Sequence, residues 1–146
     1  MILPNCEIVL GDRGEHEAII DLTVDQSSAL RDALVYYRTA RFAYNTLEAA
    51  DVLALRALDT VTDQAQRLAS GDPRGVLRLS LTSAEALNKA TELYLSERDV
   101  ESYQPIEERE RISALNELAV PVLQLVMDLR AAVLYSAENP PALALA

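Results

Sequence analysis

The sequence is poor in the residues that build covalent frameworks and metal centres. Among its 146 residues there is one cysteine, Cys6, one histidine, His16, and no tryptophan. A single cysteine excludes an intrachain disulfide framework and suits a reducing compartment, so we expect a cytoplasmic protein. One histidine beside one cysteine cannot form a histidine-rich zinc site, and a catalytic triad would depend on His16 alone. We therefore expect neither a metal nor a cofactor, and we assign no catalytic residue.

Basic residues are also scarce. The chain has 13 Lys and Arg against 23 Asp and Glu, a formal net charge of −10. A surface of that sign repels polyanions, so nucleic acid and anionic membranes are excluded as expected partners, whereas a basic protein is compatible. The N-terminus lacks the basic region of a signal peptide. The longest apolar stretch, 118–135, contains Pro121, Asp128 and Arg130, and we expect no membrane span from it.

Glycine and proline are absent between Gly14 and Gly71, which removes the usual helix breakers. Thr23 and Gln26 have the spacing of a capping box, and apolar residues then recur every seven positions with only Asp51 interrupting them. This pattern predicts one helix over 24–69, about 69 Å long at 1.5 Å per residue. Such a helix either breaks near Asp51 or projects from the domain and pairs along its length with a partner. We favour the projecting helix.

Two further helices follow. Asp72 and Pro73 are typical of a helix start and predict a helix over 73–99. The alternation of leucines at 77, 79 and 81 allows a competing interpretation, a short strand followed by a later helix capped by Thr82 and Glu85. We favour the longer helix. Pro105 opens a helix over 105–137 that is apolar almost all round and interrupted by Pro121, so it must be surrounded. We expect the first and third helices to pair antiparallel.

The N-terminal residues 1–23 differ from the rest. Two apolar runs, 8–10 and 18–22, flank a glycine-containing turn and predict a β-hairpin. Two strands alone are marginal in water, so the hairpin must lie on the helices or pair with its copy in another subunit. The expected fold is mainly all-α, a single domain over 1–146. A long-helix bundle over 24–138, three helices per chain, is completed by dimerisation, and a loose tail covers 139–146.

One cluster of polar-tipped aromatics and arginines lies in the first predicted helix. Tyrosines in an apolar stripe usually pack with the hydroxyl at the rim, and arginines beside them serve either ion pairs or recognition. An acid inside the stripe is either a polar core residue that sets register or a ligand-binding group. The candidate ligand or partner surface consists of Tyr37, Arg38, Arg41, Tyr44 and Asp51.

The sequence carries no catalytic, metal-binding or nucleic-acid motif, so function is inferred from architecture. The leading hypothesis is a non-enzymatic homodimer that acts as a protein-protein interaction or regulatory module. The first alternative is a helical bundle that binds a small molecule through the candidate surface. The second is a Mg²⁺-dependent hydrolase of phosphorylated metabolites that uses two acidic pairs, Glu48 with Asp51 and Glu107 with Glu110.

Overall fold

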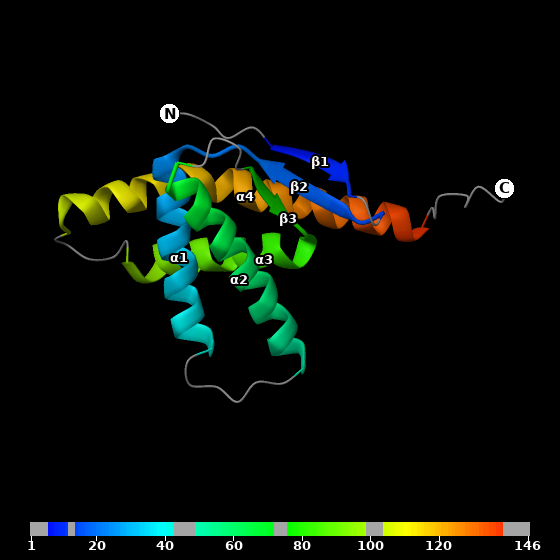
Figure 1. The fold of residues 1–146 in the computed structure, drawn as a ribbon, viewed down its shortest axis with the longest axis horizontal. Coiled ribbons are helices and arrows are strands. Elements are labelled where there is room, and N and C mark those ends of the chain that lie inside the picture. The colour runs from blue at the N-terminus through cyan, green and yellow to red at the C-terminus, as the bar shows by residue number, and fades with distance from the viewer. Residues whose placement is uncertain (1–5, 12–13, 43–48, 72–75, 99–103, 139–146) are drawn as a thin grey trace.

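The computed structural model describes residues 6–11, 14–42, 49–71, 76–98 and 104–138. These residues are mostly helical and form four helices and one small antiparallel sheet (Figure 1). The elements in chain order are β1 (Cys6–Leu10), β2 (His16–Ile20), α1 (Val24–Phe42), α2 (Ala49–Ala69), β3 (Leu77–Leu79), α3 (Leu81–Arg98) and α4 (Ile106–Glu138). The predicted tail 139–146 lies outside the described residues.

The predicted hairpin is confirmed, and a third strand extends it. β1 pairs antiparallel with β2, with Ile8 opposite Ala18, and β2 pairs antiparallel with β3, so the sheet order is β1-β2-β3. At the turn, the Gly14 N–H donates to the Gly11 carbonyl at 2.9 Å, and Gly14 adopts a φ of 78°. That left-handed conformation costs a glycine little, which explains the residue at this position.

The prediction of one helix over 24–69 is wrong, because α1 ends at Phe42 and α2 begins at Ala49. The two helices pack side by side and run antiparallel (Figure 1). Arg31 Nη1 lies 3.1 Å from Gln66 Oε1, and Arg38 Nε lies 2.9 Å from Asp59 Oδ1. In one straight helix, residues 31 and 66 would be about 52 Å apart. The apolar stripe therefore faces a neighbouring helix of the same chain, and no projecting helix is needed to cover it.

The prediction that the next helix begins at 73 is also wrong. Residues 72–75 lie outside the described residues, residues 77–79 form β3, and α3 begins at Leu81. The alternative interpretation of the leucines at 77 and 79 is correct, because Leu77–Leu79 pairs antiparallel with β2 and both leucine side chains are buried. The helix cap is Ser80 and not Thr82: its Oγ accepts the Ser83 N–H at 3.2 Å.

The last predicted helix is confirmed within a residue at each end as α4, and it contains Pro121. The expected antiparallel pairing of the first and third predicted helices is wrong. α4 runs antiparallel to α3, with ion pairs between Arg98 and Glu108 and between Arg130 and Glu85. α1 instead crosses α4 (Figure 1). The chain thus folds as two helical hairpins, α1–α2 and α3–α4, that cross each other beside the sheet, in place of three bundled helices.

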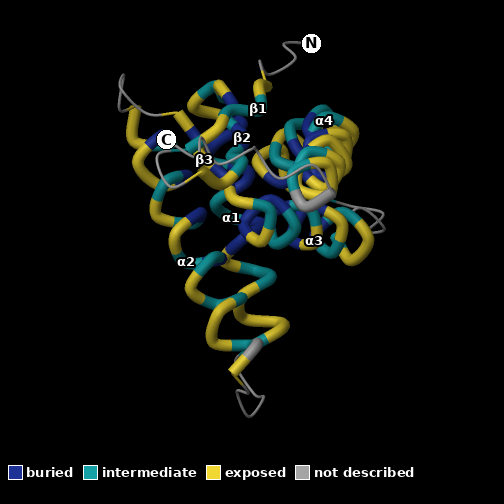
Figure 2. Tube along the Cα trace, turned by 90° about the vertical axis from the view of Figure 1, so that its right-hand side faces the viewer, coloured by how far each residue is buried: buried dark blue, intermediate teal, exposed yellow. Residues whose placement is uncertain are grey.

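A single cluster of buried apolar side chains joins the sheet to all four helices. Its members include Ile20, Leu34, Leu58, Leu87 and Leu118. The predicted capping box fixes the start of α1. The Gln26 N–H donates to Thr23 Oγ1, and the Thr23 N–H donates to Gln26 Oε1. Figure 2 shows that the core lies where the two hairpins cross, while the far end of the α1–α2 hairpin is exposed.

Candidate functional site

The predicted surface lies along the exposed part of the α1–α2 hairpin. Arg41 of α1 lies 3.4 Å from Asp51 of α2, and Arg38 is paired with Asp59. The Tyr37 and Phe42 rings meet edge to face at 6.4 Å, and the Arg41 guanidinium lies 5.3 Å above the Phe42 ring. Tyr44 lies outside the described residues. The structure therefore brings four of the five predicted residues together on two adjacent helices.

These contacts give the predicted cluster a structural role. The Asp51 carboxylate is only partly exposed and has an arginine beside it, so the cost of placing an acid in the apolar stripe is offset by an ion pair. Partial burial raises the pKa of the Tyr37 hydroxyl, although the nearby Arg41 acts in the opposite sense. Because both arginines already face carboxylates of α2, the cluster has little positive charge left for an anionic ligand.

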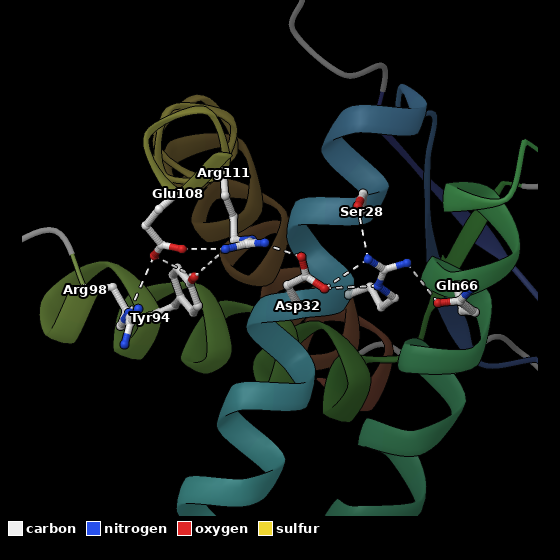
Figure 3. A network of polar contacts seen from close by, with 8 residues as sticks. Ser28, Asp32, Gln66, Tyr94, Arg98, Glu108 and Arg111 are labelled. Atoms are coloured by element: carbon white, nitrogen blue, oxygen red, sulfur yellow. Dashed lines mark hydrogen bonds and ion pairs between the residues drawn. The ribbon is translucent and has the colours of Figure 1, made fainter. Parts of the chain in front are cut away.

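A second polar cluster lies at the middle of α1, where α1 meets α3 and α4 (Figure 3). Its centre is Glu108, which is only 7% exposed. The Tyr94 hydroxyl donates to Glu108 Oε1 at 2.7 Å, and Arg111 contacts Glu108 Oε2 from one turn further along α4. Arg98 Nε lies 3.5 Å from the same carboxylate. A buried carboxylate with three polar partners is satisfied, as burial requires.

The network continues from α4 into α1 and α2. Arg111 Nε donates to Asp32 Oδ2 at 2.9 Å, and Arg31 Nε donates to Asp32 Oδ1 at 3.1 Å. Arg31 then reaches Ser28 at 3.2 Å and Gln66 at 3.1 Å. This chain of polar contacts links all four helices, which fixes how the two hairpins cross (Figure 3).

The electrostatics of this network favour the charged forms. Burial by itself raises the pKa of the Glu108 carboxyl, but the hydrogen bond from Tyr94 and the charges of Arg111 and Arg98 together lower the pKa below its ordinary value. Burial, followed by the hydrogen bond to Glu108, raises the pKa of the Tyr94 hydroxyl. For Arg111, burial by itself lowers the pKa, but the hydrogen bond and charge interaction with Tyr94, followed by those with Asp32, outweigh it and raise the pKa. The Glu108 carboxylate and the Arg111 guanidinium are therefore both ionised throughout the neutral pH range.

An open groove lies beside this network, between the N-terminal halves of α1 and α4. Its volume is about 650 Å³. The wall residues are mainly acidic or hydroxyl-bearing: Thr23, Asp25, Gln26, Ser28, Ala29, Asp32, Glu107, Glu110, Arg111, Ser113, Ala114 and Glu117. Five carboxylates thus face one cation, Arg111, which is already paired with Asp32 and Glu108. We call this feature the acidic groove.

Part of that acidity has a purely structural cause. Asp25 and Glu107 lie in the first turns of α1 and α4, where a negative charge complements the helix dipole. Glu110 and Glu117 lie further along α4, where the helix dipole does not account for an acidic residue. Within the part of the chain that the structure describes, no three His, Cys, Asp or Glu residues are arranged to hold a metal ion. The groove thus offers diffuse negative charge.

The acidic pairs of the hydrolase hypothesis lie in different places. Glu107 and Glu110 line the acidic groove beside Asp32, whereas Asp51 contacts Arg41 at the other end of α1. Along α1, Asp32 and Arg41 are about 13 Å apart. Glu48 lies outside the described residues. A common magnesium site needs carboxylates within a few ångströms of one ion, so this geometry gives the hydrolase no support.

A third feature is an apolar strip on the outer side of α4. Val120, Leu123, Met127 and Leu134 follow one another at spacings of three, four and seven residues and are all exposed, from 43 to 75%. We call this the α4 stripe. It lies on the side of α4 opposite the buried Leu118, Val122 and Leu129, as the helical period of 3.6 residues requires. Figure 2 shows that one side of α4 is buried and the other exposed. By length and composition alone α4 is able to cross a membrane, a test that core helices of soluble proteins also pass.

Sequence reasoning missed the buried network, although a signal was present. Glu108, Ile112 and Leu115 share one helical face at the spacing i, i+4, i+7, which places the acid on the core side of α4. The acidic pairs that the sequence suggests instead include its neighbours Glu107 and Glu110, which are exposed.

Comparison with known proteins identifies no relative, because no protein family, curated protein or solved structure matches the chain.

Proposed function

We propose that this protein is a non-enzymatic interaction module that works as a homodimer through the α4 stripe. The observation that carries the proposal is the stripe itself. Among the described residues nothing covers its four apolar side chains, although the opposite side of α4, from Glu108 to Leu129, is packed against α3, α1 and the sheet. A continuous exposed apolar strip on a helix is typical of an association surface. A reducing, cytoplasmic setting suits the single cysteine.

A second copy fits this stripe because the stripe is self-complementary. Two α4 helices packed antiparallel, with Met127 of one copy against Met127 of the other, place Val120 of each copy opposite Leu134 of the other. Spacings of three and four residues are those of a helix-helix seam. The stripe carries no charged side chain, so antiparallel packing brings no like charges together.

The mass in solution tests this proposal. The chain has a mass of 16.0 kDa, and we expect light scattering coupled to gel filtration to give twice that value at micromolar concentration. Met127→Glu adds a charge at the centre of the stripe and should return the monomer. The control Thr60→Glu adds the same charge at an exposed position of α2 and should leave the dimer intact. A folded 16 kDa species for the natural chain at high concentration would overturn the proposal.

A lipid surface is the other occupant that an apolar stripe fits. Flotation with neutral phosphatidylcholine vesicles distinguishes the two, because the net charge of −10 does not oppose binding to a neutral bilayer. The proposal expects no flotation by the natural chain. Flotation that Met127→Glu abolishes and Thr60→Glu does not would overturn the homodimer and assign the stripe to membranes.

A second candidate function concerns the acidic groove. Apart from Asp32, which is paired with Arg31 and Arg111, four carboxylates line this concave surface. They favour a basic peptide segment of a partner protein, since side chains of opposite charge steer association and fix register. The probe is a hexa-arginine peptide, titrated by fluorescence anisotropy at low and high salt. Glu110→Gln with Glu117→Gln should weaken binding at least tenfold. The control Glu92→Gln removes an exposed acid of α3 and should change binding by less than twofold. Equal binding by both variants contradicts this candidate.

A further inference from the structure

β1 is an edge strand that is built to be paired. The sheet order is β1-β2-β3, so β1 has β2 on one side and, among the residues that the structure describes, no strand on the other. An edge strand presents a row of backbone donors and acceptors and is a template for another strand. Proteins that keep such an edge unpaired commonly place lysine or proline within it, and the residues Cys6–Leu10 contain neither.

The backbone groups that face outward can be identified from the turn. The Gly11 N–H donates to the Glu15 carbonyl at 2.7 Å, which makes this a hydrogen-bonded pair. Hydrogen-bonded and non-hydrogen-bonded pairs alternate along an antiparallel ladder. Val9 therefore bonds to Glu17 of β2, whereas the backbone N–H and C=O of Ile8 and Leu10 point away from β2. Leu10 also has 66% of its surface exposed, although an apolar residue at an edge is usually protected.

β1 lies against a side of α4 that borders the α4 stripe. α4 packs beneath β1 and β2, and Pro121, Gln124 and Asp128 of α4 line a small cavity with Cys6 and Ile8. Pro121, Gln124 and Asp128 each follow a member of the stripe, so the side of α4 that faces β1 lies about 100° round the helix from the stripe and borders it. In Figure 2 α4 lies beside the β1 side of the sheet, with its exposed side turned away from α1. One approaching molecule is therefore able to contact both features.

The areas involved favour a joint interface. The four side chains of the stripe offer roughly 300 Å² of apolar surface, the size of an ordinary surface patch. A stable interface buries about 800 Å² on each partner. The stripe alone is too small for that, and the adjacent edge of β1 supplies further surface together with backbone hydrogen bonds.

We propose that β1 pairs antiparallel with β1 of a second copy across the dimer axis, joining the two sheets into one six-stranded sheet, with the two α4 stripes packed beneath it. This inference rests on the homodimer proposed above and specifies how that dimer is built. The expected register places Ile8 opposite Ile8 of the second copy and Cys6 opposite Leu10 of the second copy.

Charge and hydrogen bonding select that register. With Ile8 on the axis, every residue of β1 lies opposite a residue of β1 in the second copy, and the outward-facing groups of Ile8 meet those of the other Ile8. Glu7 then lies opposite Val9 of the second copy. Moving the axis to Glu7 would place two carboxylates directly opposite each other, which is destabilising. Moving it to Val9 would pair only three residues.

Amide exchange of the full-length chain, resolved by residue with NMR, tests the inference. The Val9 amide is bonded to β2 in the monomer, so it should exchange slowly at every protein concentration. The Ile8 amide should exchange at least tenfold more slowly in the dimer than in the Met127→Glu monomer. A dimer whose Ile8 amide exchanges as fast as in that monomer overturns the inference and leaves the proposed homodimer standing. A natural chain that is monomeric overturns both.

A pair of variants gives an independent readout. Leu10→Pro removes one outward-facing N–H per copy and blocks the approach of a strand, whereas Leu10→Ala keeps the N–H. We expect Leu10→Pro to raise the dimer dissociation constant at least tenfold and Leu10→Ala to raise it less than threefold. Circular dichroism and thermal melting of both variants verify the fold. If both variants fold and their dissociation constants are equal, the inference is contradicted. If Leu10→Pro unfolds, the Leu10→Ala dimer decides: an Ile8 amide that is unprotected from exchange in that dimer also contradicts the inference.

Discussion

Arg111 and Asp32, which are 79 positions apart in the chain, lie 2.9 Å apart where α4 crosses α1. The same guanidinium contacts Glu108 and the Tyr94 hydroxyl, so one side chain joins three helices. Because Glu108 is buried, its charge depends on this arginine for compensation. The crossing of the two hairpins is therefore fixed by a polar contact in addition to apolar packing.

Removal of that arginine should be costly. Arg111→Met keeps most of the aliphatic stem but leaves Glu108 buried beside the more distant Arg98. Breaking a buried pair on one side typically costs about 3 kcal/mol, so we expect a loss of that order in the free energy of unfolding. Urea denaturation measures it. Arg109→Met changes an exposed arginine of the same helix and should cost less than about 0.5 kcal/mol.

Acid should remove the contribution of Glu108. A carboxyl whose pKa is lower in the folded than in the unfolded chain stabilises the fold above the unfolded value, and it loses that contribution as the pH falls through the folded value. The pKa of Glu108 is lowered from 4.5. We expect the difference in unfolding free energy between the natural chain and Glu108→Gln to be constant from pH 7 to about pH 5 and to shrink below pH 4.5. Denaturation at a series of pH values checks this, and a difference that grows on acidification would contradict it.

Substituting two leucines of α2 distinguishes the stability due to burial from the stability due to helix propensity. Leu58 is fully buried and Leu53 is 64% exposed, yet both belong to the same helix. Leu58→Ala leaves a cavity and should cost about 2–5 kcal/mol of unfolding free energy. Leu53→Ala should cost less than about 0.5 kcal/mol, because no packing is lost. Similar losses for the two variants would mean that α2 does not present this face to the core.

The break between α1 and α2 is measurable as a distance. In a Cys6→Ser background, Val35→Cys and Asp63→Cys place one spin label on the exposed side of each helix. One continuous helix would separate these positions by about 42 Å. Neighbouring antiparallel helices have axes about 8–10 Å apart, so we expect a label distance of about 20 Å. A distribution centred above about 40 Å in the isolated Met127→Glu monomer would restore the continuous helix.

The failure of the sequence to reveal this break has a physical reason. Residues 43–48 contain neither glycine nor proline, and the seven-residue apolar repeat continues on both sides of them. An apolar stripe fits equally well against a helix of another chain and against the next helix of its own chain. Arg38 and Arg41 find their partners Asp59 and Asp51 only after the chain has reversed, so no local signal distinguishes the two arrangements.

The strand β3 was similarly undecided. The leucines at 77, 79 and 81 satisfy both a strand and the apolar face of a helix, and three residues are too few to separate the two periods. The position of β2 selects the strand. Its backbone groups on the side away from β1 need hydrogen-bond partners, and Leu77–Leu79 supplies them. The same pairing leaves β1 at the edge of the sheet, and this placement underlies the inference on how two copies associate.

Local chemistry along the chain determined what depends on neighbours in sequence: the hairpin with its glycine turn, the Thr23–Gln26 cap, the extent of α4 and the strongly acidic surface. Tertiary structure decided what depends on residues far apart. It reversed the chain between α1 and α2, crossed the two hairpins, buried Glu108 between arginines and left the α4 stripe beside the edge of β1. Periodicity states that a face must be covered, and only the packing of the whole chain selects which surface covers it.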